Sequence, residues 1–150
     1  MQLESKIEIN APSKDVWSVL TDFDHMASWN PFITEISGRP EPGSRIRVQI
    51  VPPGGRSMTF RPMVVTAEPD RVLKWLGRMV IPGIFDGEHE HRIDSLPGNR
   101  ARYTQTERFS GVLVPFAGKL LARTQAGFES MAVALKQRAE AIRRSERAGL

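Results

Sequence analysis

The chain has 150 residues, of which 40% are hydrophobic and 25% charged, a composition that is ordinary for one globular domain. No window approaches the roughly 20 apolar residues that a bilayer span needs, and the start lacks the basic and apolar pattern of a signal peptide, so we expect a cytoplasmic protein without membrane insertion. Cysteine is absent, which excludes disulfides and thiolate metal sites, and the net charge of +4 is too dispersed to indicate a nucleic-acid partner.

Hydrophobic periodicity predicts the first elements of the chain. Apolar residues alternate with charged ones over residues 3–9, as in a half-buried strand. Residues 13–20 then carry an apolar stripe at helical spacing, with Asp15 in the first turn, where the helix dipole favours an acid. A shorter helix over residues 24–29 is expected to end just before Pro31, because a residue that precedes proline avoids the helical conformation.

The middle of the chain has the pattern of antiparallel strands separated by short turns. Turn sequences recur regularly with no helix between them, which favours a meander over parallel βαβ units. Pro62 indicates an edge or a bulge within its strand. The first strand, separated from the others by the small helices, is expected to pair with a distant strand and help to close a curved sheet. The six segments cover residues 32–38, 45–51, 57–67, 71–79, 84–96 and 100–111.

The last segment, residues 114–144, changes to a helical period. Apolar residues from Phe116 to Ile142 step by three and four, which marks one face of a long helix. At ~1.5 Å per residue such a helix can cross a whole sheet. Gly127 within it indicates a close approach to the sheet or space beneath the helix. The elements together predict an α+β fold in which this helix covers the apolar face of a curved antiparallel sheet.

Four short motifs near the N-terminus occur in an order that is known from one family. This order resembles the opening of the START/polyketide-cyclase (SRPBCC) superfamily, which has the helix-grip fold. The later segments LKWLGR, FDGEHEHRI, ERFSGVL and GFESMAVALKQRAE are similar to its uncharacterised bacterial polyketide cyclase/dehydratase-like branch. The N-terminal motifs are Ala11-Pro12, Val16-Trp17, Leu20–Asp22 and Trp29-Asn30-Pro31.

The resemblance implies a single START/polyketide-cyclase-like ligand-binding domain over residues 1–150. Its sheet is expected to have seven strands, to wrap around the long C-terminal helix and to leave an interior cavity, with two short helices after strand 1. Members include lipid and sterol carriers, hormone receptors, aromatic-polyketide cyclases and the ligand-binding domains of ring-hydroxylating oxygenases, so the fold does not select a function. The histidines here lack the two-His-plus-carboxylate arrangement of the oxygenase branch.

The hairpin between residues 84 and 111 allows the inner face of the sheet to be predicted. If its turn centres on Gly98, His89 lies opposite Glu107, and His91 lies opposite Gln105. That face carries nearly all the apolar residues of the two strands, whereas the other face is uniformly polar, so it must point inward. Its polar groups need partners or water, which favours a hydrated or ligand-filled cavity over a dry core. The face comprises Phe85, Gly87, His89, His91 and Ile93 with Tyr103, Gln105, Glu107 and Phe109.

The pair of histidines at positions 89 and 91 has three interpretations. A metal site is disfavoured, because three or four ligands must converge while same-face strand neighbours stand ~6.6–7 Å apart. A general acid–base pair would use His89 oriented by Glu107. The third interpretation is a binding cavity in which the polar side chains orient a ligand among apolar walls. The same polar groups could also satisfy one another with no ligand at all, as in a partner-binding regulator whose cavity is vestigial.

The prediction is a protein that binds a small hydrophobic molecule, which is aromatic, polyketide-like or lipid-like, in an interior cavity. The alternative is an enzyme of cyclase or dehydratase type with His89 and Glu107 as catalytic residues. We expect a monomer or a weak homodimer, with no metal and no other cofactor. The predicted ligand-binding residues are Trp75, Phe85, His89, His91, Tyr103, Gln105, Glu107, Phe109, Phe128 and Met131.

Overall fold

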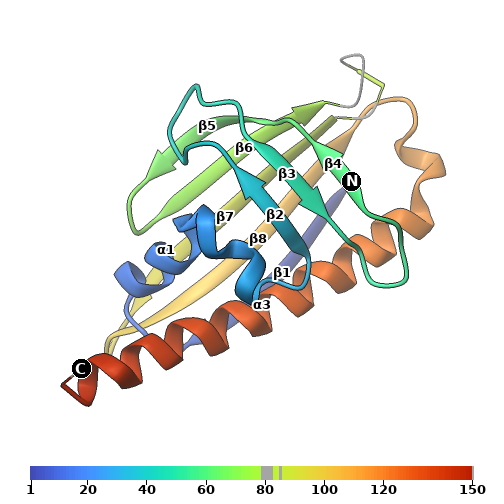
Figure 1. Ribbon diagram of the computed structural model, residues 1–150. Helices are drawn as coiled ribbons and strands as arrows, with labels where there is room; N and C mark the ends of the chain where they lie inside the picture. Colours follow the sequence, from blue (N-terminus) through green and yellow to red (C-terminus); the bar gives the residue numbers. More distant parts are fainter. Residues whose placement is uncertain (79–82, 85, 150) are drawn as a thin grey trace.

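The computed structural model describes residues 1–78, 83–84 and 86–149 (Figure 1). Strand β1 is followed by three short helical segments, then by seven further strands and finally by a long helix. The elements are β1 (Gln2–Ile9), α1 (Ser13–Thr21), η1 (Phe23–His25), α2 (Met26–Trp29), β2 (Ile33–Ser37), β3 (Arg47–Ile50), β4 (Met58–Phe60), β5 (Met63–Glu68), β6 (Val72–Arg78), β7 (Asp86–Leu96), β8 (Arg100–Ser110), η2 (Val114–Phe116) and α3 (Gly118–Arg147).

The described strands form two antiparallel sheets. The larger sheet has the order β1-β8-β7-β6-β5, and the smaller one has the order β2-β3-β4. Strand β1 pairs with β8 along its whole length, which confirms that the first strand pairs with a distant partner. The predicted hairpin register is also confirmed, because His89 lies opposite Glu107 and His91 opposite Gln105.

The expected seven-stranded sheet is wrong, because the structure has eight strands in two sheets over the described residues. The segment predicted as one strand, residues 57–67, is divided at Pro62 into β4 and β5. Proline has no N–H for a strand ladder. Strand β4 pairs with β3, whereas β5 pairs with β6. The two sheets stay joined where Ile46 N donates to Pro62 O over 2.9 Å and Val64 N donates to Ser44 O over 2.9 Å.

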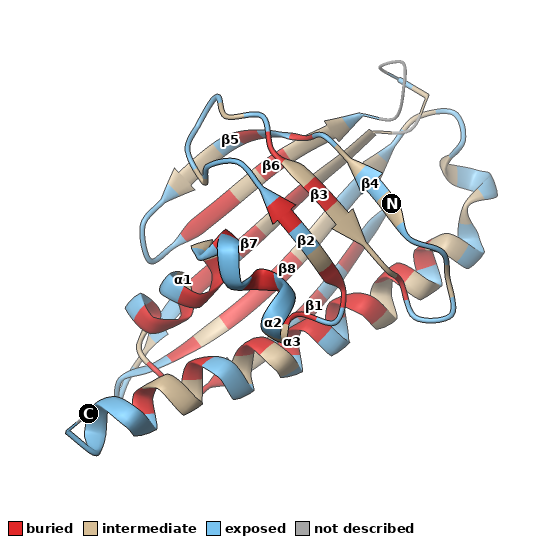
Figure 2. Cartoon of the chain, in the orientation of Figure 1, coloured by how far each residue is buried: buried red, intermediate tan, exposed pale blue. Residues whose placement is uncertain are grey.

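Helix α3 runs across the fold, and one face of it is buried (Figure 2). The predicted long helix is therefore confirmed, although it begins at Gly118 and Phe116 lies outside it with 84% of its surface exposed. Among the described residues, no helix is both long enough and apolar enough to cross a membrane. The buried residues of α3 are Leu121, Thr124, Gly127, Phe128, Met131, Ala132, Leu135, Ala139 and Arg143.

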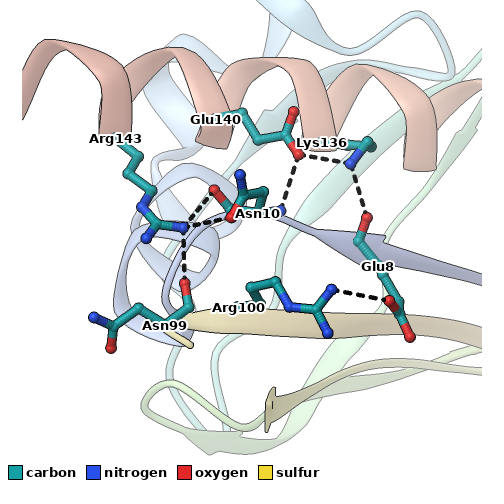
Figure 3. A network of polar contacts seen from close by, with 7 residues as sticks. All are labelled: Glu8, Asn10, Asn99, Arg100, Lys136, Glu140 and Arg143. Atoms are coloured by element: carbon teal, nitrogen blue, oxygen red, sulfur yellow. Dashed lines mark hydrogen bonds and ion pairs between the residues drawn. The ribbon is translucent and has the colours of Figure 1, made fainter. Parts of the chain in front are cut away.

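Polar side chains of α3 hold its C-terminal half against the end of β1 (Figure 3). Lys136 Nζ donates to Glu8 O over 3.0 Å, and the backbone N–H of Asn10 donates to Glu140 Oε1 over 2.9 Å. Burial raises the pKa of Glu140, but the hydrogen bonds from Lys136 and Asn10 outweigh it, and the net pKa is lowered. These bonds tie the C-terminal half of α3 to the end of β1.

At Gly127, α3 lies in close contact with the segment before β2. A Cβ atom built at Gly127 would overlap the ring of Phe32. That ring in turn packs edge-on against Phe128, with centroids 5.6 Å apart. The glycine in the helix is therefore explained by close packing.

We expect Gly127→Ala to destabilise the protein by about 1–3 kcal/mol. Alanine normally makes a helix about 1 kcal/mol more stable than glycine does, so the expected effect is the reverse of the usual one. The methyl group has to displace the ring of Phe32, which is held by buried neighbours. Gly118→Ala is the matched control, because a Cβ there meets nothing within 4 Å. Urea unfolding measures both variants, and equal stability of the two would show that the Phe32 contact is not tight.

Candidate ligand-binding site

A pocket of about 100 Å³ lies between the two sheets and helix α3. Apolar side chains form most of its wall, with Trp75 and Phe128 among them. The exposed Arg78 stands at the rim with half-buried neighbours, which marks the side where the pocket meets solvent. The described lining residues are Phe32, Ile33, Val48, Ile50, Met58, Phe60, Pro62, Trp75, Gly77, Arg78, Gly87, His89, Glu107, Phe109, Leu120, Thr124 and Phe128.

Two glycines face each other across strands β6 and β7 and line the pocket. Gly77 is paired with Gly87 in the ladder, and both lie on the face that points inward. A Cβ at Gly77 would make ordinary contacts, 3.7 Å from Cβ of Pro62. A Cβ at Gly87 would instead overlap Oε1 of Glu107. The missing side chain at Gly77 leaves empty space in the pocket, whereas the missing side chain at Gly87 leaves room for the carboxylate of Glu107.

His89 is held from both ends of its imidazole ring. Its Nδ1 bonds to Oε2 of Glu107, and its Nε2 lies 3.0 Å from Nε2 of Gln105. The amide of Gln105 donates, so Nε2 of His89 accepts and Nδ1 carries the proton that is donated to Glu107. Gln105 Nε2 also lies 3.7 Å from Sδ of Met131. The network defines one neutral tautomer of His89.

Aromatic packing fixes the plane of the same ring. His89 stacks on Trp75 with centroids 5.0 Å apart and planes 17° apart, and it meets Phe128 edge-on at 5.2 Å. Because both ring nitrogens already have protein partners, His89 has no free nitrogen to act on a bound molecule in this arrangement. His89 therefore positions Glu107 and contributes a flat surface to the wall.

Glu107 presents the polar atom that is open to the pocket. Its Oε2 is taken by His89, whereas Oε1 makes no hydrogen bond to the described part of the chain and lies over Gly87. The side chain is 12% exposed, so the oxygen faces the pocket more than bulk water. A carboxylate oxygen in this position can accept a hydrogen bond or a proton from a ligand.

His91 and Tyr103 form a second pair that is buried behind the pocket. The Tyr103 hydroxyl lies 2.6 Å from Nδ1 of His91, and both residues are 0% exposed. Burial lowers the pKa of His91 well below its usual value. Burial likewise raises the pKa of the Tyr103 hydroxyl. Both groups are therefore neutral at physiological pH.

We expect His91→Gln to make the stability of the protein less sensitive to acid. In the native state His91 stays neutral below pH 6.5, the usual pKa of a histidine, whereas in the unfolded chain it takes up the proton. Unfolding therefore becomes easier as the pH falls, by up to about 1.4 kcal/mol per pH unit from this residue. Urea denaturation between about pH 5 and pH 8 measures the slope for both proteins. Parallel curves over that range would contradict a neutral buried His91.

Within the described part of the chain, no three His, Asp or Glu side chains converge in a way that could hold a metal ion. His89 and His91 have ring centroids 4.4 Å apart, but each is bonded to a different protein partner. The chemistry that the site offers is hydrogen bonding and proton acceptance by Glu107 within an apolar enclosure.

Comparison with known proteins places the chain in a family. The profile of the polyketide cyclase / dehydrase and lipid transport family matches residues 1–140. The chain belongs to this family. No curated protein matches the sequence.

Several solved structures share the fold of this chain. The Zhui aromatase/cyclase from Streptomyces sp. R1128 has a TM-score of 0.71 at 21% identity, with 99% of this chain and 98% of that chain covered. A START superfamily protein from Mycobacterium smegmatis has a TM-score of 0.71 at 20% identity, with 94% and 98% covered. Protein MLL2253 from Mesorhizobium loti has a TM-score of 0.74 at 16% identity, with 94% and 98% covered. At these identities the likeness establishes the fold alone.

The structure of this family member separates the predicted site residues into two groups. One group lines the pocket, and it consists of Trp75, His89, Glu107, Phe109 and Phe128. The other group, which consists of His91, Tyr103, Gln105 and Met131, is buried behind the first and supports it. Phe85 lies outside the described residues.

The opposite wall of the pocket consists of residues that the sequence pattern did not indicate as part of the site. That wall comes from the segment before β2, from the smaller sheet and from the first turns of α3. The alternation of Val48 and Ile50 with polar residues already marked an inward face on β3, but nothing local shows which cavity that face meets. The unassigned residues are Phe32, Ile33, Val48, Ile50, Phe60, Leu120 and Thr124.

Proposed function

We propose that the protein binds a small hydrophobic molecule, of aromatic, polyketide-like or lipid-like character, in the pocket between the sheets and α3. The observation that carries this proposal is an apolar pocket of about 100 Å³ in which Gly77 and Gly87 leave the wall without side chains. Ligand sites are usually enclosures of this kind, apolar with a few placed polar groups. Family membership supports the same function, because the family description includes lipid transport.

Native mass spectrometry of the protein purified from its own host tests the proposal. A bound small molecule is expected as a mass increment on the folded protein that disappears on denaturation. A protein that never carries such an increment, and that takes up no apolar probe in vitro, would leave the pocket as a vestigial feature of a regulator.

A second candidate function is catalysis of the cyclase or dehydratase type. It is favoured by Glu107, whose Oε1 faces the pocket while His89 holds Oε2. Glu107 would accept a proton from the substrate, and the Nδ1–H of His89 would orient the carboxylate and stabilise its charge. The Zhui structure is titled an aromatase/cyclase, and it shares the fold.

Glu107→Gln and His89→Gln separate the two candidates once a ligand is identified. Glutamine at position 107 keeps the shape of glutamate but is a poor base. Binding that survives while turnover of the ligand disappears would establish the enzyme. Binding with no turnover in the wild-type protein would establish the carrier.

A further inference from the structure

We infer that the ligand of this pocket is a neutral ring compound with a single hydrogen-bond donor, a phenol-like hydroxyl or an indole-like N–H, that binds Oε1 of Glu107. This inference rests on the proposed binding function and adds the chemical class of the ligand to it. It follows from which polar atoms around the pocket already have partners and which do not.

Two polar side chains of the described lining, His89 and Thr124, are bonded to the protein itself. Both nitrogens of His89 are bonded, to Glu107 and to Gln105. The Thr124 hydroxyl donates to the carbonyl of Leu120 over 2.8 Å, within its own helix. Arg78 is exposed at the rim. Oε1 of Glu107 is thus the carboxylate oxygen that is left for a ligand, beside the Thr124 hydroxyl oxygen, which has donated its proton but can still accept.

The backbone opposite Glu107 is shaped to keep this oxygen in place. Any side chain at position 87 would occupy the space of Oε1, so glycine is required for the carboxylate to lie against the sheet. Phe109, the next inward residue on β8, lies 3.8 Å from the same Cβ position and closes the other side. A carboxyl oxygen that lacks a partner in an apolar enclosure is costly, and a ligand donor removes that cost.

The number and charge of the donors follow from the same geometry. An ammonium group brings three donors, more than the side-chain acceptors of the described lining can satisfy, whereas a phenol or an indole brings one. A carboxylate ligand would be repelled by Glu107. The flat faces of Trp75 and Phe128 suit a ring, and a volume of about 100 Å³ is suited to one ring. An engineered apolar cavity of about 150 Å³ in another protein holds benzene, so the pocket here takes at most one ring, with any substituent directed toward the open side near Arg78.

The test uses 4-ethylphenol and 4-ethyltoluene, which have nearly the same shape and differ by one hydroxyl donor. Isothermal titration calorimetry on the wild-type protein is expected to show 4-ethylphenol binding on the order of 10- to 100-fold more tightly. Glu107→Met is expected to remove this preference, because it keeps the length of the side chain and removes the acceptor. Glu35→Gln, on the exposed side of β2, is the matched control and is expected to preserve it.

The possible outcomes separate a failure of the donor-recognition inference from a failure of the proposed binding function. If both probes bind the wild-type protein equally well, the donor-recognition inference is wrong while the proposed binding function stands. If neither probe binds, both fail. A preference that persists in Glu107→Met would assign recognition to another acceptor and overturn the role of Glu107. If Glu107→Met does not fold, the comparison of the two probes on the wild-type protein still tests the donor-recognition inference.

Discussion

Gly77→Leu is expected to abolish ligand binding, because the added side chain blocks the pocket sterically. We expect the affinity to fall by at least about 100-fold. The leucine side chain would project into the pocket from the inner face of β6, beside Trp75. The fold is expected to survive, because a Cβ at Gly77 meets only ordinary contacts. Burial of a leucine contributes about 1.5–3 kcal/mol, so the variant should unfold at the same or a higher temperature than the wild-type protein.

Calorimetric titration with 4-ethylphenol, together with a thermal unfolding curve, measures both parts of this expectation. Gly77→Ala provides a smaller obstruction and is expected to weaken binding less. Thr59→Leu on β4 is a control that adds bulk to an exposed position outside the pocket lining. A folded Gly77→Leu variant that binds with wild-type affinity would mean that the ligand sits elsewhere.

Arg143→Met is expected to destabilise the protein by about 2–4 kcal/mol. Arg143 is 8% exposed, and its Nη1 donates to the carbonyl of Asn10, to Oδ1 of Asn10 and to the carbonyl of Asn99 over 2.7–3.0 Å (Figure 3). The side chain thereby ties the end of α3 to the end of β1 and to the turn between β7 and β8. Methionine keeps the aliphatic stem but leaves all three acceptors without this donor.

Urea unfolding measures this effect, and two further variants serve as comparisons. Arg143→Lys keeps the positive charge but loses the planar group, and it is expected to lie between wild type and Arg143→Met. Arg144→Met changes the neighbouring exposed arginine and is expected to stay within about 0.5 kcal/mol of wild type. Equal stability of Arg143→Met and Arg144→Met would show that the network in Figure 3 does not anchor the helix.

The hairpin register could be predicted from the sequence because its turn is local. Gly98 and Asn99 adopt positive φ angles of 80° and 54°, as short turns often require, and they fix which residues of β7 and β8 oppose one another. From that register the inward face and the pair of His89 with Glu107 followed directly. The long helix could be predicted equally well, because its apolar residues recur at helical spacing over many turns.

The sequence could not predict how many strands the structure has. Nor could it predict how deeply each site residue is buried. Pro62 could sit at an edge, at a bulge or at a break, and the choice depends on which strand each side of it meets. His89 and His91 share a face, yet one lines the pocket and the other is sealed behind it. Their depth depends on where α3 crosses the sheet, which is a tertiary property.

The roles within the His89–Glu107 pair also needed the tertiary structure. The sequence placed the two side chains opposite each other, with His89 as the candidate acid or base. The bond from Gln105 occupies the second nitrogen of His89, and the space over Gly87 leaves one oxygen of Glu107 open. We therefore propose Glu107 as the residue that meets the ligand, with His89 positioning it.

The central claim is that a small apolar molecule binds between the sheets and α3, and NMR titration of the ¹⁵N-labelled protein with 4-ethylphenol tests it most directly. Saturable shifts are expected at amides from three separate walls of the pocket, those of Val48, Gly77 and Thr124, with little change at the outward-facing Thr106. The absence of saturable shifts, or shifts confined to the outer face of the larger sheet, would contradict the claim.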